Sequence, residues 1–140
     1  MFFNDQNLIN IKQIEDQDPK NGKIIVLQEN ENIPFDIKRV YCIFCSNKDT
    51  VRGKHAHKNL KQAIICLSGH CKVILDNGTS KKTYKLDSQD RYLLINECVW
   101  REITDFSENC ILMVLASEVY NENDYIRDYS KFLEFVSSYV

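Results

Sequence analysis

Short apolar runs separated by polar turns dominate the chain up to residue 116. The runs are rich in Ile and Val, and such runs between Gly-, Pro- or Asn-bearing segments are typical of β-strands. The segment Asp76-Asn77-Gly78-Thr79 separates two of them, and Asn-Gly favours the positive φ angles of a type I′ hairpin turn. The pattern predicts strands over residues 9–14, 23–28, 37–45, 62–67, 71–75, 82–86, 92–95, 99–103 and 111–116.

The end of the chain has a helical pattern instead. Apolar residues recur there at three- and four-residue steps, which gives a helix one apolar face: Tyr125, Tyr129, Phe132, Leu133 and Val136. We expect a short C-terminal α-helix over about residues 123–138, with Asn121 or Asn123 as its cap. Many short strands at near-regular spacing predict an all-β sandwich or barrel, and 140 residues suit one domain spanning 1–140.

One predicted strand is apolar on both faces. It reads Ala63-Ile64-Ile65-Cys66-Leu67, whereas an antiparallel sheet normally turns one face to water. We expect a second copy of the chain to cover the outer face, so the sequence predicts a homodimer.

Charge is nearly balanced overall but uneven along the chain. A net charge of −2 argues against general nucleic-acid binding. Residues 50–75, however, contain no Asp or Glu and include all three histidines and five basic side chains: Arg52, Lys54, Lys58, Lys61 and Lys72. A basic island in an acidic protein suits a small anionic ligand such as a phosphate or a nucleotide.

The cysteines and the hydropathy indicate a cytoplasmic protein. The first residues lack the basic segment and long apolar run of a signal peptide, and no apolar run is long enough to span a membrane. Six free thiols are therefore expected, most of them as small core residues. Cys42 and Cys45 have metal-ligand spacing, but an extended strand turns them to opposite faces.

His55 and His57 are the main chemical signal. Alternate residues of a strand share a face, and a pair of imidazoles on one face suits either metal binding or proton relay. With Gly53, Gln62 and Gly69 they resemble the first motif of the cupin β-barrels, in which Glu usually stands in the place of Gln62.

The ligand set for a metal is incomplete in this motif. The region of the second cupin motif, residues 96–102, has no histidine, and His70 is expected to be exposed in a turn after Gly69. A tight metal site needs three or four ligands. The sequence therefore predicts neither a metal nor another cofactor.

A closer resemblance covers nearly the whole chain. The stretches 33–41, 52–58, 99–102, 105–107, 115–118 and 124–129 together resemble the dTDP-4-keto-6-deoxyglucose 3,4-ketoisomerases, which are metal-independent cupins. The resemblance implies a jelly-roll-like antiparallel β-barrel and a homodimer with exchanged strands. It also implies a dTDP-linked 4-keto-6-deoxy sugar as substrate, which is prepared for 3-amination in the assembly of glycans such as lipopolysaccharide O-antigen.

The reaction itself requires a base and an acid. Moving a carbonyl group from C4 to C3 removes the C3 proton, forms an enediol or enediolate, and protonates C4. We expect His55 and His57 to perform these steps, and the keto group already acidifies the neighbouring C–H bond. A donor to O4 is also needed, and Arg52, Tyr41 and the Trp100 indole N–H are candidates.

The predicted substrate-binding residues are Arg52, Arg39, Tyr41, Lys72, Trp100 and Arg101. Arg52 precedes Gly53 as in the dTDP-sugar 3,5-epimerases, and guanidinium suits a bidentate phosphate contact. Arg39 and Tyr41 share a strand face, and Trp100 is a candidate to stack on thymine. Arg101 stands where some relatives are expected to have histidine.

Three other functions stay open at this point, and one of them is a metal-dependent oxygenase. A 3,5-epimerase-like cupin would use similar proton chemistry without moving the carbonyl group. A non-catalytic cupin would bind a sugar nucleotide without needing titratable histidines.

Overall fold

The structure is a computed structural model that describes residues 3, 7–15 and 17–138. Its strands are β1 (Leu8–Asn10), β2 (Gln13–Glu15), β3 (Lys23–Ile25), β4 (Arg39–Cys45), β5 (Arg52–His57), β6 (Gln62–Ser68), β7 (Cys71–Asp76), β8 (Lys81–Leu86), β9 (Arg91–Ile95), β10 (Trp100–Thr104), β11 (Cys110–Ala116) and β12 (Tyr125–Ile126). The helix α1 spans Tyr129–Ser137. The predicted strands are confirmed, except that residues 9–14 are divided between β1 and β2. The hairpin between β7 and β8 is also confirmed, although Gly78 has a positive φ angle and Asn77 does not, whereas a type I′ turn would require one at both positions.

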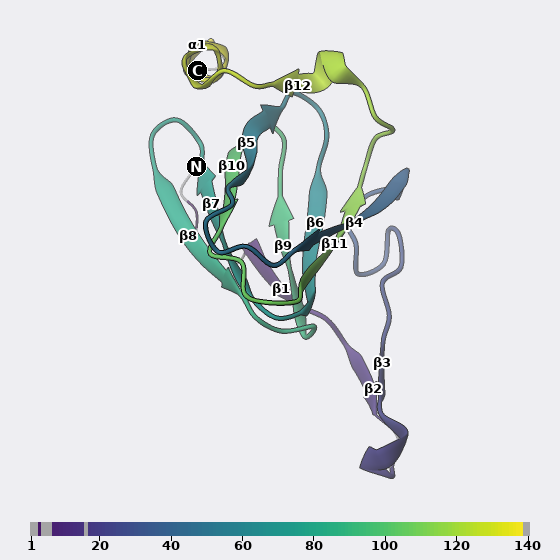
Figure 1. The fold of residues 1–140 in the computed structure, drawn as a ribbon. Helices are drawn as coiled ribbons and strands as arrows, with labels where there is room; N and C mark the ends of the chain where they lie inside the picture. Colours follow the sequence, from purple (N-terminus) through teal and green to yellow (C-terminus); the bar gives the residue numbers. More distant parts are fainter. Residues whose placement is uncertain (1–2, 4–6, 16, 139–140) are drawn as a thin grey trace.

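Two antiparallel five-stranded sheets make the body of the molecule (Figure 1). One has the order β1-β9-β6-β11-β4 and the other β12-β5-β10-β7-β8. The predicted all-β, jelly-roll-like fold is confirmed, but the sheets do not close into a barrel: among the described residues, no strand of one sheet pairs with a strand of the other. The architecture is a jelly-roll-like pair of facing sheets, whose inner side chains form the main core.

The N-terminal segment covers the outer face of the first sheet. Ile33 and Phe35 are buried there against Ile65 of β6 and Leu115 of β11. The Tyr92 hydroxyl donates to the Asn32 carbonyl over 2.7 Å and ties the segment to β9. The chain thus buries by itself the face for which the sequence predicted a second subunit.

The β2–β3 hairpin projects away from the two sheets (Figure 1). Ile14 and Ile24 lie opposite each other in its register and are 50% and 60% exposed. Apolar side chains of this size on a projecting two-stranded ribbon form a surface suited to association.

The C-terminal helix begins later than the sequence predicted. Asp128 is its cap, because the side chain accepts from the Lys131 backbone N–H over 3.0 Å. Asn121 caps a short 3₁₀ turn over Glu122–Asp124 instead. Tyr125 then pairs with His57 as part of β12, so this tyrosine belongs to a sheet and not to the helix.

All six cysteines are free, and Cys66, Cys71 and Cys110 are buried in the core. Burial raises the pKa of the Cys66 thiol to about 12 and also raises that of Cys71. These thiols therefore stay protonated and act as small core side chains. Within the described part of the chain, no helix is both long and apolar enough to cross a membrane.

The N-terminal cover generates a stability prediction. Ile33→Ala should lower the free energy of unfolding by about 2–5 kcal/mol, because it opens a cavity beside β6 and β11. Urea unfolding followed by Trp100 fluorescence measures the change. Val51→Ala is the control, because Val51 is 41% exposed and its truncation should cost less than about 0.5 kcal/mol. Equal costs for both variants would show that the N-terminal segment is outside the cooperative core.

Candidate active site

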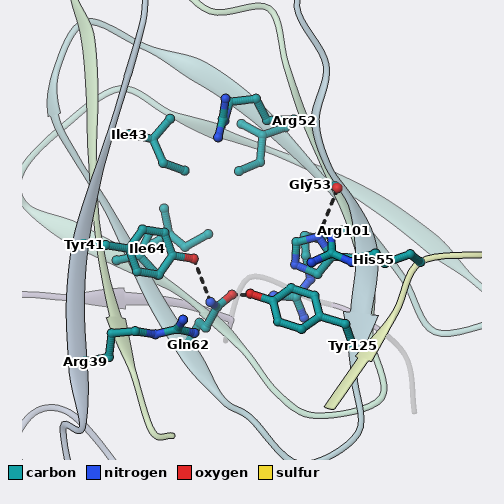
Figure 2. Close-up of a pocket in the computed structure, with 13 residues that line it drawn as sticks. Arg39, Tyr41, Ile43, Arg52, Gly53, His55, Gln62, Ile64, Arg101 and Tyr125 are labelled. Atoms are coloured by element: carbon teal, nitrogen blue, oxygen red, sulfur yellow. Dashed lines mark hydrogen bonds between the residues drawn. The ribbon is translucent and has the colours of Figure 1, made fainter. Parts of the chain in front are cut away.

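A cavity of about 320 Å³ lies between the two sheets (Figure 2). Five of the predicted site residues line it: Arg39, Tyr41, Arg52, His55 and Arg101. The polar lining also includes Gln62, Tyr125 and Arg127, and the apolar lining is Ile43, Ile64, Ile103 and Val114. The cavity is therefore mostly polar and carries four arginines.

A bulge in β5 positions His55. The pairing of β5 with β10 shifts register between Arg101 and Glu102, opposite Gly53 and His55. Gly53 has φ +84°, and a Cβ atom there would lie 2.9 Å from the Arg101 carbonyl oxygen. Only glycine permits both this φ angle and the close approach of the two strands.

The same turn of the chain sets the tautomer of His55. Its Nδ1 lies 3.0 Å from the Gly53 carbonyl oxygen, which only accepts. Nδ1 therefore carries the hydrogen, and Nε2 keeps its lone pair. Burial, and then the charge of Arg101, lower the pKa of His55 to about 4. His55 is a neutral imidazole near pH 7, with a basic Nε2.

His57 lies behind His55 and does not line the cavity. Its ring is fully buried, with its centroid 4.9 Å from that of His55 and 4.3 Å from that of Tyr125. Its Nδ1 donates to Asp124 Oδ2 over 3.0 Å, and Asp124 Oδ1 accepts from the Asn59 backbone N–H over 2.8 Å. Burial lowers the pKa of His57 well below its usual value. The two histidines share a face as predicted, but only His55 reaches the cavity.

A buried guanidinium forms the inner wall of the cavity. Arg101 is 2% exposed, and it donates from Nη1 to Gln62 Oε1 and from Nη2 to the Val99 carbonyl over 3.0 Å. Gln62 Nε2 in turn lies 2.9 Å from the Tyr41 hydroxyl (Figure 2). Burial lowers the pKa of Arg101 to about 10, which leaves it cationic near neutral pH. No carboxylate within the described residues forms an ion pair with it.

The other arginines lie apart around the cavity. Figure 2 shows Arg52 beside Ile43 at one end and Arg39 at the opposite end. Arg39 stacks over the Tyr41 ring at 5.3 Å, and its buried Nε and Nη2 have no partner within the described residues. Arg127 is held by Glu122 at 2.7 and 2.9 Å. Unpaired guanidinium groups around a cavity suit an anionic ligand such as a diphosphate.

The structure does not bring two predicted binding residues to the cavity. Lys72 is on β7 and pairs with Asp105 over 3.2 Å at the surface. Trp100 is buried under α1, with its ring centroid 5.2 Å from that of Tyr129 and 5.7 Å from that of Phe132. Trp100 thus anchors the helix, and both residues lie away from the place where a ligand would bind.

Two cavity residues were missed as functional candidates from the sequence. Tyr125 fits the apolar spacing of the predicted helix. The available signal for a functional role was its place in the family-like stretch 124–129. Arg127 was part of the family-like stretch 124–129, so its basic side chain was the available signal. Gln62 was noted only as a departure from the usual Glu of cupins.

The side chains around the cavity do not suit a metal ion. Within the described residues, no three His, Cys, Asp or Glu side chains cluster as ligands. His57 turns Nδ1 to Asp124, and the cationic Arg101 lies beside Gln62, where a cation would be repelled. A divalent ion needs more ligands and less positive charge than this site offers.

Comparisons with known proteins agree with this geometry. The family model described as "FdtA: WxcM-like, C-terminal" matches residues 4–137. A TDP-4-oxo-6-deoxy-alpha-D-glucose-3,4-oxoisomerase from Aneurinibacillus thermoaerophilus is 45% identical over 133 residues, which are 95% of this chain and 94% of that protein.

Solved structures of a sugar 3,4-ketoisomerase are also similar. QdtA from Thermoanaerobacterium thermosaccharolyticum, in complex with TDP, is 43% identical with a TM-score of 0.89 over 94% of each chain. A histidine-to-asparagine mutant of QdtA in complex with TDP-4-keto-6-deoxyglucose is 42% identical with a TM-score of 0.88, over 94% of this chain and 93% of that chain.

The environment of His55 generates a pH prediction. NMR titration of the native protein should give His55 a midpoint near pH 4, with hydrogen on Nδ1 and none on Nε2. In urea the same ring should titrate at its ordinary, higher pH. Between about pH 6.5 and pH 4 the ring is protonated in the unfolded chain but not in the native protein. The His55 contribution therefore makes folding less favourable as the pH falls through this range.

His55→Asn assigns the signal, and exposed His70 serves as a reference ring in the same spectra. A native midpoint for His55 equal to its midpoint in urea would contradict the burial and tautomer described above.

Proposed function

Because the chain belongs to the FdtA family (WxcM-like, C-terminal), we propose that it converts TDP-4-keto-6-deoxyglucose into the 3-keto isomer by histidine-mediated proton transfer. It is a sugar 3,4-ketoisomerase, and the relatives that share this activity match it over nearly their whole length. Complexes of QdtA with TDP and with TDP-4-keto-6-deoxyglucose support the same nucleotide-sugar substrate for this chain.

The observation that carries the proton-transfer mechanism is the free Nε2 of His55 at the cavity wall. Its Nδ1–H is engaged by Gly53, and the ring is neutral near pH 7. Nε2 takes the proton from C3, and the electron pair of the C3–H bond forms the C3–C4 double bond while negative charge develops on O4. The O3 proton then passes to O4, and protonated His55 returns its proton to C4 as the C3–O3 double bond forms, which completes the 3-keto isomer.

His57 has a supporting role in this proposal. Its ring packs edge-on against His55 at 90°, and Asp124 fixes its orientation. Because it does not line the cavity, we assign it as a positioning residue for His55 and Tyr125, which do.

The arginines bind the substrate in this proposal. The unpaired N–H groups of Arg39 and the exposed guanidinium of Arg52 are suited to the diphosphate. Because Arg39 and Arg52 lie at opposite ends of the cavity, one of them contacts the diphosphate, and the middle of the cavity, between His55 and Tyr41, is left for the sugar ring. The diphosphate is thus bound at one end and the chemistry takes place at the centre.

We also propose a cytoplasmic homodimer. The projecting β2–β3 hairpin, with its exposed Ile14 and Ile24, is the part of the chain that can exchange with a second copy. Six free cysteines are typical of a reducing compartment. Glycan assembly, including lipopolysaccharide O-antigen, is the proposed destination of the product after 3-amination.

The activity is tested directly with TDP-4-keto-6-deoxyglucose and NMR identification of the product, with EDTA present. The wild type should form the 3-keto isomer. His55→Asn should lose at least ~100-fold in turnover while it still binds TDP, because Asn cannot accept a proton near neutral pH. His57→Asn should lose less, since its ring does not reach the cavity.

His70→Asn makes the same change at an exposed position and should leave turnover unchanged. Normal turnover in folded His55→Asn would remove histidine from the chemistry. Failure of the wild type to form any isomer would reject the proposed activity.

The dimer is tested by analytical ultracentrifugation. Ile24→Lys should shift the protein from dimer to monomer, because it places a charge in the proposed apolar contact. Val51→Lys adds the same charge at another exposed position and should stay dimeric. A wild type that sediments as a monomer at micromolar concentration would reject the proposed exchange.

A further inference from the structure

The hydrogen bonds from Arg101 through Gln62 to Tyr41 can run in one direction only. A guanidinium group only donates, so the Gln62 atom that Arg101 contacts is the carbonyl Oε1. The Gln62 amide nitrogen therefore faces Tyr41 and donates to its hydroxyl oxygen over 2.9 Å. The Tyr41 hydroxyl accepts in this contact, and its own hydrogen is directed elsewhere.

The free hydrogen of Tyr41 is available to a ligand. Tyr41 lines the cavity, and no acceptor within the described residues takes its hydrogen. Its near neighbour Arg39, whose guanidinium stacks on the Tyr41 ring, has no acceptor to offer. Figure 2 places the Tyr41 hydroxyl across the cavity from His55. A ligand between them would meet a base on one side and a hydrogen-bond donor on the other.

We propose that Gln62 is a positioning residue, which keeps the Tyr41 hydroxyl as donor to the substrate oxygen that becomes negative in the enediolate. The inference rests on the proposed ketoisomerase function. As His55 removes the C3 proton, the carbonyl π-electron pair moves to O4, and Tyr41 stabilises this oxygen by a hydrogen bond without giving up its proton. The Arg101 charge lies one amide group behind Tyr41 and acts on the same oxygen.

The chemical identity of Gln62 is essential to this arrangement. A carboxylate at this position would accept from both Arg101 and Tyr41, so the hydroxyl hydrogen would turn away from the cavity. It would also form a buried ion pair with Arg101 and neutralise the Arg101 charge. The neutral amide thus preserves both the direction of the hydrogen bonds and the positive charge.

A double-mutant cycle tests the coupling. Tyr41→Phe should lower kcat about 100-fold, the usual effect of losing one oxyanion donor. Gln62→Met keeps the chain length but removes both hydrogen bonds, and should lower kcat roughly tenfold with TDP affinity retained. In the Tyr41→Phe background, Gln62→Met should have little further effect, because Gln62 acts through Tyr41.

Gln62→Glu tests the charge. Besides lowering kcat, it should move the acidic limb of the kcat/KM profile to higher pH, because a carboxylate offsets the Arg101 charge that lowers the pKa of His55. The other charged or titratable groups near His55 are His57 on β5 and Glu122, Tyr125 and Arg127 in the C-terminal segment, and they are unchanged in this variant. Gln62→Met adds no charge, so it should shift the acidic limb of the kcat/KM profile less than Gln62→Glu does. Gln28→Glu makes the same change at an exposed residue and should match the wild type.

Additive losses in the double mutant, or wild-type kcat in Gln62→Met, would overturn the proposal. TDP binding and circular dichroism establish that each variant folds. If Gln62→Glu does not fold, the cycle with Gln62→Met decides the question alone. A wild type without isomerase activity would reject the proposed function, whereas an active wild type with uncoupled variants would reject only the role of Gln62.

Discussion

The charge of Arg101, buried without a carboxylate partner, is the constraint on which the site depends. Removing a guanidinium from water is costly, and hydrogen bonds to an amide and a backbone carbonyl offset the cost only in part. Burial, and after it the positive potential of Arg101, lowers the pKa of the neighbouring histidines and keeps them neutral, and the potential also favours negative charge in the cavity. In the proposed reaction the enediolate supplies such charge, so the buried Arg101 charge favours that intermediate.

A bulge, the N-terminal segment and the C-terminal helix together hold the residues of the cavity in place. The bulge between β5 and β10 brings His55 and Arg101 to the same place, although they are 46 positions apart in the chain. The N-terminal segment covers the outer face of the first sheet, and α1 packs on Trp100 at the second. These contacts bury apolar side chains outside the space between the sheets, so that space can hold polar groups without leaving the body of the protein under-packed.

The pattern of apolar runs and turns was enough to predict most of the strands, because strand and turn residues act on the local backbone conformation. It failed at Tyr125, whose spacing from Tyr129 fits a helix, while pairing with His57 across the fold holds it in a strand. The family-like stretches correctly placed Arg39, Tyr41, Arg52, His55 and Arg101 on one cavity. Trp100, from the same stretches, and Lys72, from the basic island, do not line the cavity. A residue type shows what a side chain can bind but not which way the tertiary structure turns it. The sequence likewise does not show that His57 is buried behind His55, because that position depends on how the strands pack in three dimensions.

The contact between His55 and the Gly53 carbonyl has a consequence for how the enzyme can change over evolutionary time. A histidine oriented by a carboxylate loses its partner by one side-chain substitution. Here the partner is a main-chain atom, which every amino acid possesses, so no replacement of a side chain can delete it directly. Only a change in backbone path, such as one forced by losing the glycine at position 53, would release the ring. The tautomer of His55, the proposed base, is thereby independent of substitutions in the side chains around it.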